Sequence, residues 1–110
     1  MEKKNLFETS VEESINDIIS QLRNSKREPV YTTDVLDENA KQEIANKMKR
    51  DIYCYEYQGF WYYLTFEGLI DDFYSYITAA MSLDDDYYTS MSLIDYVERF
   101  EVEEYKPIKA

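Results

Sequence analysis

Apolar residues recur at helical spacing near the start of the chain. They share one face of a helix predicted over residues 11–24, at Val11, Ile15, Ile18, Ile19 and Leu22. Ser10 and Glu13 have the spacing of a capping box, in which the hydroxyl and the carboxylate each accept a hydrogen bond from a free backbone amide. The polar residues after Asn24, followed by Pro29, predict the end of this helix.

A second helix is predicted from Asp34 or Asp37 to Arg50. Its apolar positions step by four residues along one face, at Leu36, Ala40, Ile44 and Met48. Acidic residues lie near its start and basic residues near its end, an arrangement that the helix dipole favours. The chain between the two helices, from Val30 to Thr33, predicts a short extended segment.

Two segments rich in aromatic and β-branched residues predict a β-hairpin in the middle of the chain. They run from Ile52 to Tyr57 and from Phe60 to Phe66, and Gln58-Gly59 between them has the length of a tight turn. Side chains of a strand alternate between its two faces. One face therefore carries Tyr53, Tyr55 and Tyr57, and the other carries Ile52, Cys54 and Glu56.

The C-terminal part of the chain predicts two further helices. After Gly68, apolar residues at helical spacing predict a helix from Leu69 to Met81. Ser92 and Asp95 form a second capping-box spacing, and a helix is predicted over residues 93–102. The tail from Glu103 is polar and either frays or adds an edge strand.

The predicted order is helix, helix, hairpin, helix, helix, which is an α+β fold. Two N-terminal helices, a central β-hairpin and two C-terminal helices form a single acidic domain over residues 1–110. No interdomain linker and no internal repeat is evident. Hydrophobic residues make up 45% of the chain, which is enough for a core and unlike a disordered segment.

Charge is distributed unevenly along the chain. The net charge is −11, and residues 1–50 hold ten acids and nine bases. Residues 51–110 hold thirteen acids and only three bases, together with eleven of the twelve tyrosines. Such a field repels nucleic acid and anionic membrane and attracts basic surfaces.

Several kinds of catalytic chemistry lack their usual residues. The chain has no histidine, which removes the commonest general base and metal ligand, and it has no glycine-rich phosphate loop. Cys54 is the only cysteine, so no internal disulfide forms. We therefore expect no enzymatic activity, no cofactor and no metal ion. Residues 1–7 are polar and no apolar run reaches membrane-spanning length, so we expect a cytoplasmic protein.

Acids and tyrosines lie close together in the C-terminal half, and this combination predicts a binding surface. Carboxylates three or four residues apart on a helix lie about 5–6 Å from one another, which is comparable to the phosphate spacing of a nucleic-acid strand. Tyrosines add contact area with few rotatable bonds. The predicted partner-binding residues are Asp71, Asp72, Tyr74, Tyr76, Asp84, Asp85, Asp86, Tyr87, Tyr88, Asp95, Glu98 and Glu101.

This composition is similar to that of antagonists from phages and mobile elements, namely anti-restriction proteins and acidic anti-CRISPR proteins that occupy the DNA channel of a nuclease. The resemblance implies a non-catalytic inhibitor whose DNA-mimicking surface binds a basic, nucleic-acid-binding host or defence protein, such as a nuclease or CRISPR effector. It implies no direct contact of the chain with nucleic acid or membrane.

A second resemblance involves the hairpin. The segment from Trp61 to Gly68 resembles the wing and the LTxxG exit of winged-helix regulators, and the preceding helix would then be the recognition helix. Its bases are Lys41, Lys47, Lys49 and Arg50. Two features depart from that family, because residues 29–50 are few for a strand and two helices, and residues 51–66 contain no base.

Two alternatives to the inhibitor hypothesis therefore stay open. One is a winged-helix-like DNA binder that acts through the bases of the second helix. The other is a protein-interaction or regulatory module, such as a homodimer formed through the aromatic hairpin. The residues that would form this dimer interface are Tyr53, Tyr55, Tyr57, Trp61 and Tyr63.

Overall fold

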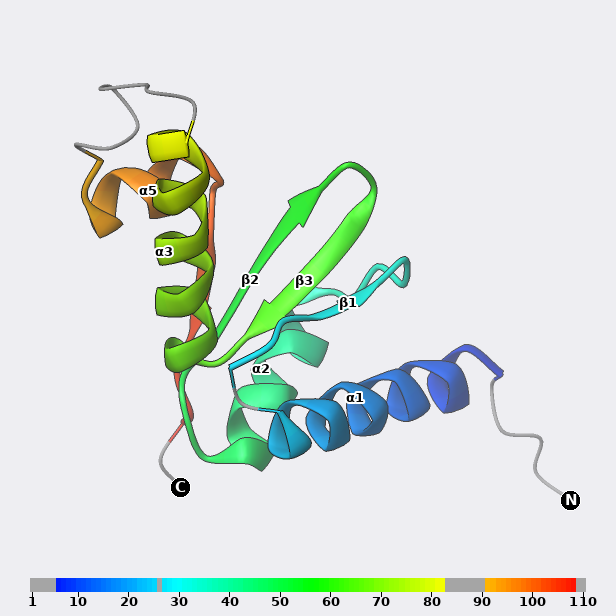
Figure 1. Ribbon diagram of the computed structural model, residues 1–110. Helices are drawn as coiled ribbons and strands as arrows, with labels where there is room; N and C mark the ends of the chain where they lie inside the picture. The colour runs from blue at the N-terminus through cyan, green and yellow to red at the C-terminus, as the bar shows by residue number, and fades with distance from the viewer. Residues whose placement is uncertain (1–5, 26, 83–90, 109–110) are drawn as a thin grey trace, which may run out of the picture.

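The computed structural model describes residues 6–25, 27–82 and 91–108, which form helices on both faces of a small antiparallel sheet (Figure 1). In chain order the elements are α1 (Leu6–Asn24), β1 (Val30–Thr32), α2 (Glu38–Met48), β2 (Ile52–Tyr57), β3 (Phe60–Leu64), α3 (Phe66–Ser82), α5 (Leu93–Arg99) and β4 (Glu103–Tyr105). The chain is therefore a mixed α+β protein, as predicted. The predicted order of two helices, a hairpin and two helices is not confirmed, because β1 lies between α1 and α2, β4 follows α5, and the hairpin is part of a four-stranded sheet.

The sheet has the strand order β1-β3-β2-β4, and every neighbouring pair is antiparallel. The hairpin β2–β3 is its centre, with Cys54 opposite Tyr63 and Tyr55 opposite Tyr62. The short extended segment after α1 becomes β1 and pairs with β3. The C-terminal tail becomes the edge strand β4 and pairs with β2, so the edge-strand alternative is confirmed for Glu103–Tyr105.

One face of the sheet is covered by α1 and α2 (Figure 1). Strand residues of even number on β2, such as Ile52 and Cys54, point to this face, as does Tyr63 of β3. They pack against apolar residues of the helices, including Leu22 of α1 and Ile44 of α2, and all of these side chains are fully buried. This layer follows from the alternation of the strands and the four-residue step of the helices.

The opposite face is covered by α3 and α5. Tyr53 and Tyr55 of β2 and Leu64 of β3 are buried there against Leu69 and Tyr96. The predicted division of β2 into two faces is therefore confirmed. Because both faces of the sheet carry helices, the central strands are buried on both sides, which explains their run of apolar and aromatic residues.

The hairpin turn is formed by Gln58 and Gly59, as predicted. Their φ angles are +52° and +84°, and two consecutive positive values are typical of the tight turns that match the twist of a hairpin. Gly59 has no steric cost in this conformation.

Helix boundaries depart from the prediction at three places. Helix α1 begins at Leu6, so Ser10 lies inside the helix and the predicted capping box there is wrong. Helix α3 begins at Phe66, because Thr65 Oγ1 accepts a hydrogen bond from the amide of Gly68 at 3.2 Å and caps the helix. Gly68 consequently lies in the first turn and does not end the preceding segment. Helix α5 ends at Arg99, short of the predicted residue 102.

Helix α2 is defined at both ends by its own residues. Asp37 Oδ1 accepts from the amide of Ala40 at 2.8 Å, and Lys49 closes the other end with φ of +58°. This is the one helix between β1 and β2, both of which lie in fully described chain. A winged-helix protein would have two helices at this point, so the topology departs from that resemblance.

Candidate protein-binding surface

Helix α5 carries two of the predicted partner-binding acids, Asp95 and Glu98, and a third, Glu101, follows its end. At its start the Ser92 hydroxyl and the Asp95 carboxylate each accept the other residue's amide at 3.2 Å, so this predicted capping box is confirmed. On its inner face Tyr96 is 3% exposed and contacts the rings of Phe73 and Tyr76 edge-on, at 5.4 and 5.5 Å between centroids. Aromatic packing thus fixes the inner face of α5, and the acidic residues of the helix lie on its solvent-exposed side.

The outer side of α5 and its exit is acidic. Asp95, Glu98 and Glu101 are all exposed, and they follow one another at intervals of three residues. Glu101 has φ of +52°, and the amide of Val102 then donates to the carbonyl of Val97 at 2.9 Å. This tight reversal leads the chain from α5 into β4 and holds Glu101 next to the end of the helix. We name Asp95, Glu98 and Glu101 the α5 acid row.

Asp72 has a structural role that the sequence did not reveal. Its Oδ2 accepts hydrogen bonds from the hydroxyls of Tyr55 at 2.6 Å and Tyr96 at 2.9 Å. Both tyrosines are buried, and burial together with the nearby carboxylate raises the pKa of each phenol above its usual range. Asp72 therefore joins α3, β2 and α5, and its carboxylate is directed into the protein.

Three other predicted residues divide between the surface and the interior. Tyr74 is 62% exposed on α3, as expected of a contact residue. Tyr76 instead packs against the aromatic layer, with its ring edge-on to Phe100 at 5.4 Å. Asp71 binds Arg27, which donates to both carboxylate oxygens at 2.8 and 3.0 Å, and this contact raises the pKa of the guanidinium further.

The remaining predicted residues, Asp84, Asp85, Asp86, Tyr87 and Tyr88, lie outside the described residues. They connect α3 to α5 in the sequence.

Bases of the N-terminal half neutralise acids of the C-terminal half. Arg50 donates to both oxygens of Glu67 at 2.8 and 2.6 Å, and this contact lowers the Glu67 pKa to about 2. Lys41 Nζ lies 2.9 Å from Glu103 Oε1. Together with the Arg27 pair, these contacts reduce the charge asymmetry of the sequence. In the chain that the structure describes, no such ion pair reaches Glu98 or Glu101.

The Lys41 site was not evident in the sequence. The side chain is only 5% exposed, and its ammonium lies 3.8 Å from the centroid of the Trp61 ring, a cation–π contact. Glu103 also accepts from the Tyr105 hydroxyl at 3.3 Å. Burial opposes the ionisation of Glu103, but the hydrogen bond and charge of Lys41 outweigh it and lower its pKa. Strand β4 is thus tied to α2, which makes the site structural.

The bases proposed for DNA contact are mostly engaged within the protein. Lys41 is buried, Arg50 is paired with Glu67, and Lys47 lies 3.5 Å from Glu43. Lys49 is exposed at the C-cap of α2. This helix therefore presents little free positive charge, which does not favour the DNA-binding alternative.

The hairpin residues proposed for a dimer are mostly inside the protein. Tyr53, Tyr55 and Tyr63 are buried, and Trp61 lies under Lys41. Tyr57 alone among these five is exposed, at 47%. The aromatic residues that do reach the surface of the sheet are different ones, and they were not singled out from the sequence.

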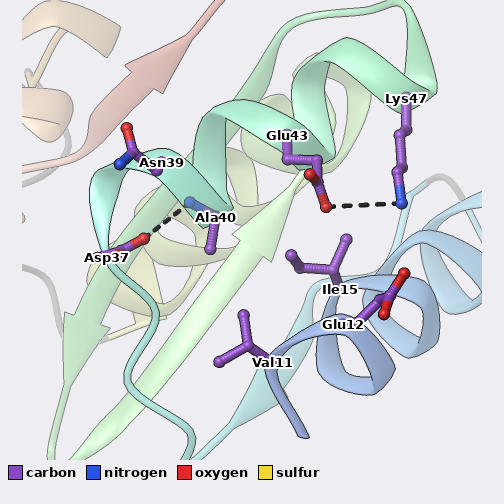
Figure 2. A pocket seen from close by; sticks show the side chains of 8 residues that line it. All are labelled: Val11, Glu12, Ile15, Asp37, Asn39, Ala40, Glu43 and Lys47. Carbon is purple, nitrogen blue, oxygen red and sulfur yellow. Dashed lines mark hydrogen bonds and ion pairs between the residues drawn. The ribbon is translucent and has the colours of Figure 1, made fainter. Parts of the chain in front are cut away.

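A shallow groove lies between α1 and α2, with a volume of about 460 Å³ (Figure 2). Val11 and Ile15 of α1 face Ala40 and Glu43 of α2 across it. Its charged groups are carboxylates and one lysine, which is already paired with Glu43.

No protein-family model matches the chain, and no curated protein or solved structure is detectably similar to it. Among the helices of the described ranges, none combines the length and apolar character needed to cross a membrane. The function must therefore be argued from the surface itself.

Proposed function

We propose that the protein is a non-catalytic inhibitor that binds a basic, nucleic-acid-binding protein through an acidic surface centred on α5. The observation that supports this most directly is the α5 acid row. Asp95 and Glu98 are exposed on a helix that packs on buried aromatic rings, and Glu101 is exposed in the turn that follows it. Carboxylates about 5–6 Å apart on a helix, as at Asp95 and Glu98, reproduce part of the charge spacing of a nucleic-acid strand.

The distribution of ion pairs favours this surface over the rest of the C-terminal half. Acids on α3 and β4 are neutralised by Arg27, Arg50 and Lys41. The α5 acid row receives none of these three bases, and the one base on α5 itself is Arg99. A partner rich in arginine would supply the missing positive charge through paired hydrogen bonds to the carboxylates.

Helix α3 adds one exposed predicted residue to the proposed surface. Tyr74 is exposed on α3, which packs beside α5 in the same layer. In the sequence, Asp84–Asp86 and Tyr87-Tyr88 join these two helices. The proposed surface therefore retains Tyr74 and the α5 acid row from the predicted set. Asp72 and Tyr76 belong to the core layer and Asp71 to an ion pair, so we exclude these three.

The partner class that suits such a surface is a nuclease or CRISPR effector with a positively charged DNA or RNA channel. Inhibition would follow from occupation of that channel, so that the protein and the nucleic acid compete. This is the mode of action of anti-restriction and anti-CRISPR antagonists, and we propose it here on electrostatic grounds.

The proposal is tested by affinity capture from a lysate of the organism that carries the protein, followed by mass spectrometry. We expect a nucleic-acid-binding protein that is released by competing DNA or RNA and by high salt. The substitutions Glu98→Gln and Glu101→Gln together should weaken its binding at least tenfold. Glu12→Gln with Glu13→Gln is the matched control, because both residues are exposed on α1 and the net charge changes equally.

Two results would contradict the proposal. One is a captured partner that binds the protein and its nucleic acid simultaneously. The other is an equal loss of affinity in both double variants, because net charge and not the α5 acid row would then determine binding.

A further inference from the structure

Exposed aromatic rings form a continuous patch on the sheet, on the face that α3 and α5 cover only in part. Tyr31 of β1, Tyr62 of β3 and Tyr55 of β2 lie in register across three adjacent strands. The rings of Tyr31 and Tyr62 are 5.9 Å apart, and those of Tyr62 and Tyr55 stack at 5.1 Å and 15°. We name these three residues the tyrosine row.

A second pair of rings extends the row toward the hairpin turn. Phe60 and Tyr57 are opposite each other in the hairpin, and Phe60 lies edge-on to Tyr31 at 6.1 Å. Exposure increases from Tyr55, which is 7% exposed beside α5, to Tyr31, which is 65% exposed at the edge strand. The row thus begins in the core at Tyr55 and ends in solvent at Tyr31, and Phe60 and Tyr57 are also exposed, at 39% and 47%.

Such a platform can stack on nucleobases, on a second copy of the chain or on cationic side chains. The charge of the protein decides among them. Strands β1, β2 and β3 contain no lysine or arginine, and the chain carries a net charge of −11. A nucleic acid stacked on the row would therefore find no base to neutralise its phosphates on these strands.

The same charge favours cations. The face of an aromatic ring is its negative side, and arginine stacks on it more readily than lysine because the guanidinium is planar and weakly hydrated. The ring of Phe100 contacts Tyr55 and Tyr57, and the exposed Glu101 follows Phe100 in the chain. The patch therefore adjoins the end of α5, where an exposed acidic residue would add to the attraction.

The protein already makes one contact of this kind. On the opposite face of the sheet, the ammonium of Lys41 lies over the ring of Trp61. Each face of the sheet thus carries aromatic rings, and on one of them a cation of the chain already lies over a ring.

We propose that the tyrosine row, with Phe60 and Tyr57, is a docking surface for arginine side chains of a protein partner. This inference rests on the proposed function, because the partner is the same basic protein and the row supplies a second contact beside the α5 acid row. Arginines stack on the rings while the acids bind the neighbouring positive charges.

The experiment uses defined probes on the full chain. Fluorescently labelled octa-arginine, octa-lysine and oligothymidine are titrated at low and moderate salt, and binding is followed by anisotropy. We expect the arginine peptide to bind more tightly than the lysine peptide, since the planar guanidinium stacks better and each exposed cation–π contact contributes about 2–5-fold, and oligothymidine not to bind. Tyr31→Leu with Phe60→Leu should abolish the preference, since both residues keep apolar bulk without a ring.

Tyr31→Phe is the matched control and should retain the preference, because the ring face remains. Thermal melting checks that each variant is folded. Equal affinity of the wild type for both peptides would overturn the inference, as would a preference unchanged in the leucine variant. Binding of oligothymidine that depends on Tyr31 would assign the row to nucleobases. A dimer in sedimentation that depends on Tyr31 and Phe60 would assign it to a second copy, and either result rejects the arginine assignment.

Failure of this inference is distinguishable from failure of the proposed function. If both peptides bind equally and both weaken in the Glu98→Gln, Glu101→Gln variant, the α5 acid row is functional and the tyrosine row is not. If the arginine preference persists and that variant binds both peptides normally, the tyrosine row binds cations and the α5 acid row does not.

Discussion

Asp72 provides the most informative test of how this fold is held together, since it was expected at a binding surface and instead accepts two internal hydrogen bonds. The perturbation is Asp72→Ala. It leaves the hydroxyls of Tyr55 and Tyr96 without their common acceptor, and these residues are 7% and 3% exposed. A buried donor left unsatisfied costs about 1–3 kcal/mol.

The magnitude follows from the surroundings of the carboxylate. Asp72 is itself partly exposed, so water reaches its position in the variant and the lower end of the range applies to each hydroxyl. We therefore expect Asp72→Ala to lower the free energy of unfolding by about 2 kcal/mol. Asp72→Asn keeps a neutral acceptor oxygen and should cost about 1 kcal/mol. The gain in helix propensity with alanine, about 0.5 kcal/mol, opposes part of this loss.

A double-mutant cycle in urea isolates the hydrogen bond from these other effects. Tyr96→Phe should lower the free energy of unfolding by about 1 kcal/mol in the wild type and by clearly less in the Asp72→Ala background. Tyr63→Phe is the matched control, because the Tyr63 hydroxyl is buried and no described residue hydrogen-bonds to it. That substitution should be neutral or stabilising. A coupling energy of zero between Asp72 and Tyr96 would refute the reasoning.

Three further predictions concern stability and reactivity. Lys41→Met should lower the free energy of unfolding, measured in urea, by about 1–2 kcal/mol, because it leaves the half-exposed Glu103 without its cation. An unchanged free energy of unfolding would show that the Lys41–Glu103 pair is not stabilising. Because Arg50 lowers the Glu67 pKa, the stabilisation from that pair is complete above about pH 4.3 and is lost as pH falls toward 2. The stability advantage of wild type over Glu67→Gln should therefore shrink across this range, and a constant difference would contradict the pair. Burial raises the pKa of the Cys54 thiol to about 12, so thiol reagents at pH 8 should react only after unfolding, and rapid labelling of the native protein would refute this.

Local patterns in the sequence were sufficient to predict most of the elements. The four-residue apolar step of α2 and the alternation of the hairpin strands are properties of adjacent residues, and both were confirmed. The helix starts were less predictable, because several neighbouring residues could each serve as the N-cap. Thr65 is the N-cap of α3, although Gly68 is the stronger signal of an element boundary in the sequence.

The sheet and the ion pairs depend on residues far apart in the chain, and local patterns carry no information about them. β4 joins β2 across about 50 residues, and Lys41 meets Glu103 at a separation of 62. Charges that look segregated in the sequence are therefore partly neutralised in the fold. The same applies to Asp72, whose two tyrosine partners come from β2 and α5.

The candidate surface was predicted in part. The three-residue spacing predicted Asp95, Glu98 and Glu101 on one helix; all three are exposed, but the helix ends at Arg99 and Glu101 lies in the turn after it. The tyrosine row was missed because its residues come from three strands whose pairing includes β1, a strand of three residues. A short strand of this kind gives too weak a sequence signal to establish register.

The central claim is that a localised acidic surface, and not net charge, binds a basic partner. The most direct measurement is the dissociation constant of the captured partner for two variants with equal changes in charge. One variant neutralises Asp84, Asp85, Asp86, Glu98 and Glu101, and the other neutralises Glu12, Glu13, Asp17, Glu28 and Glu38. We predict a loss of at least a hundredfold in the first and little change in the second; unchanged binding in the first variant would contradict the account.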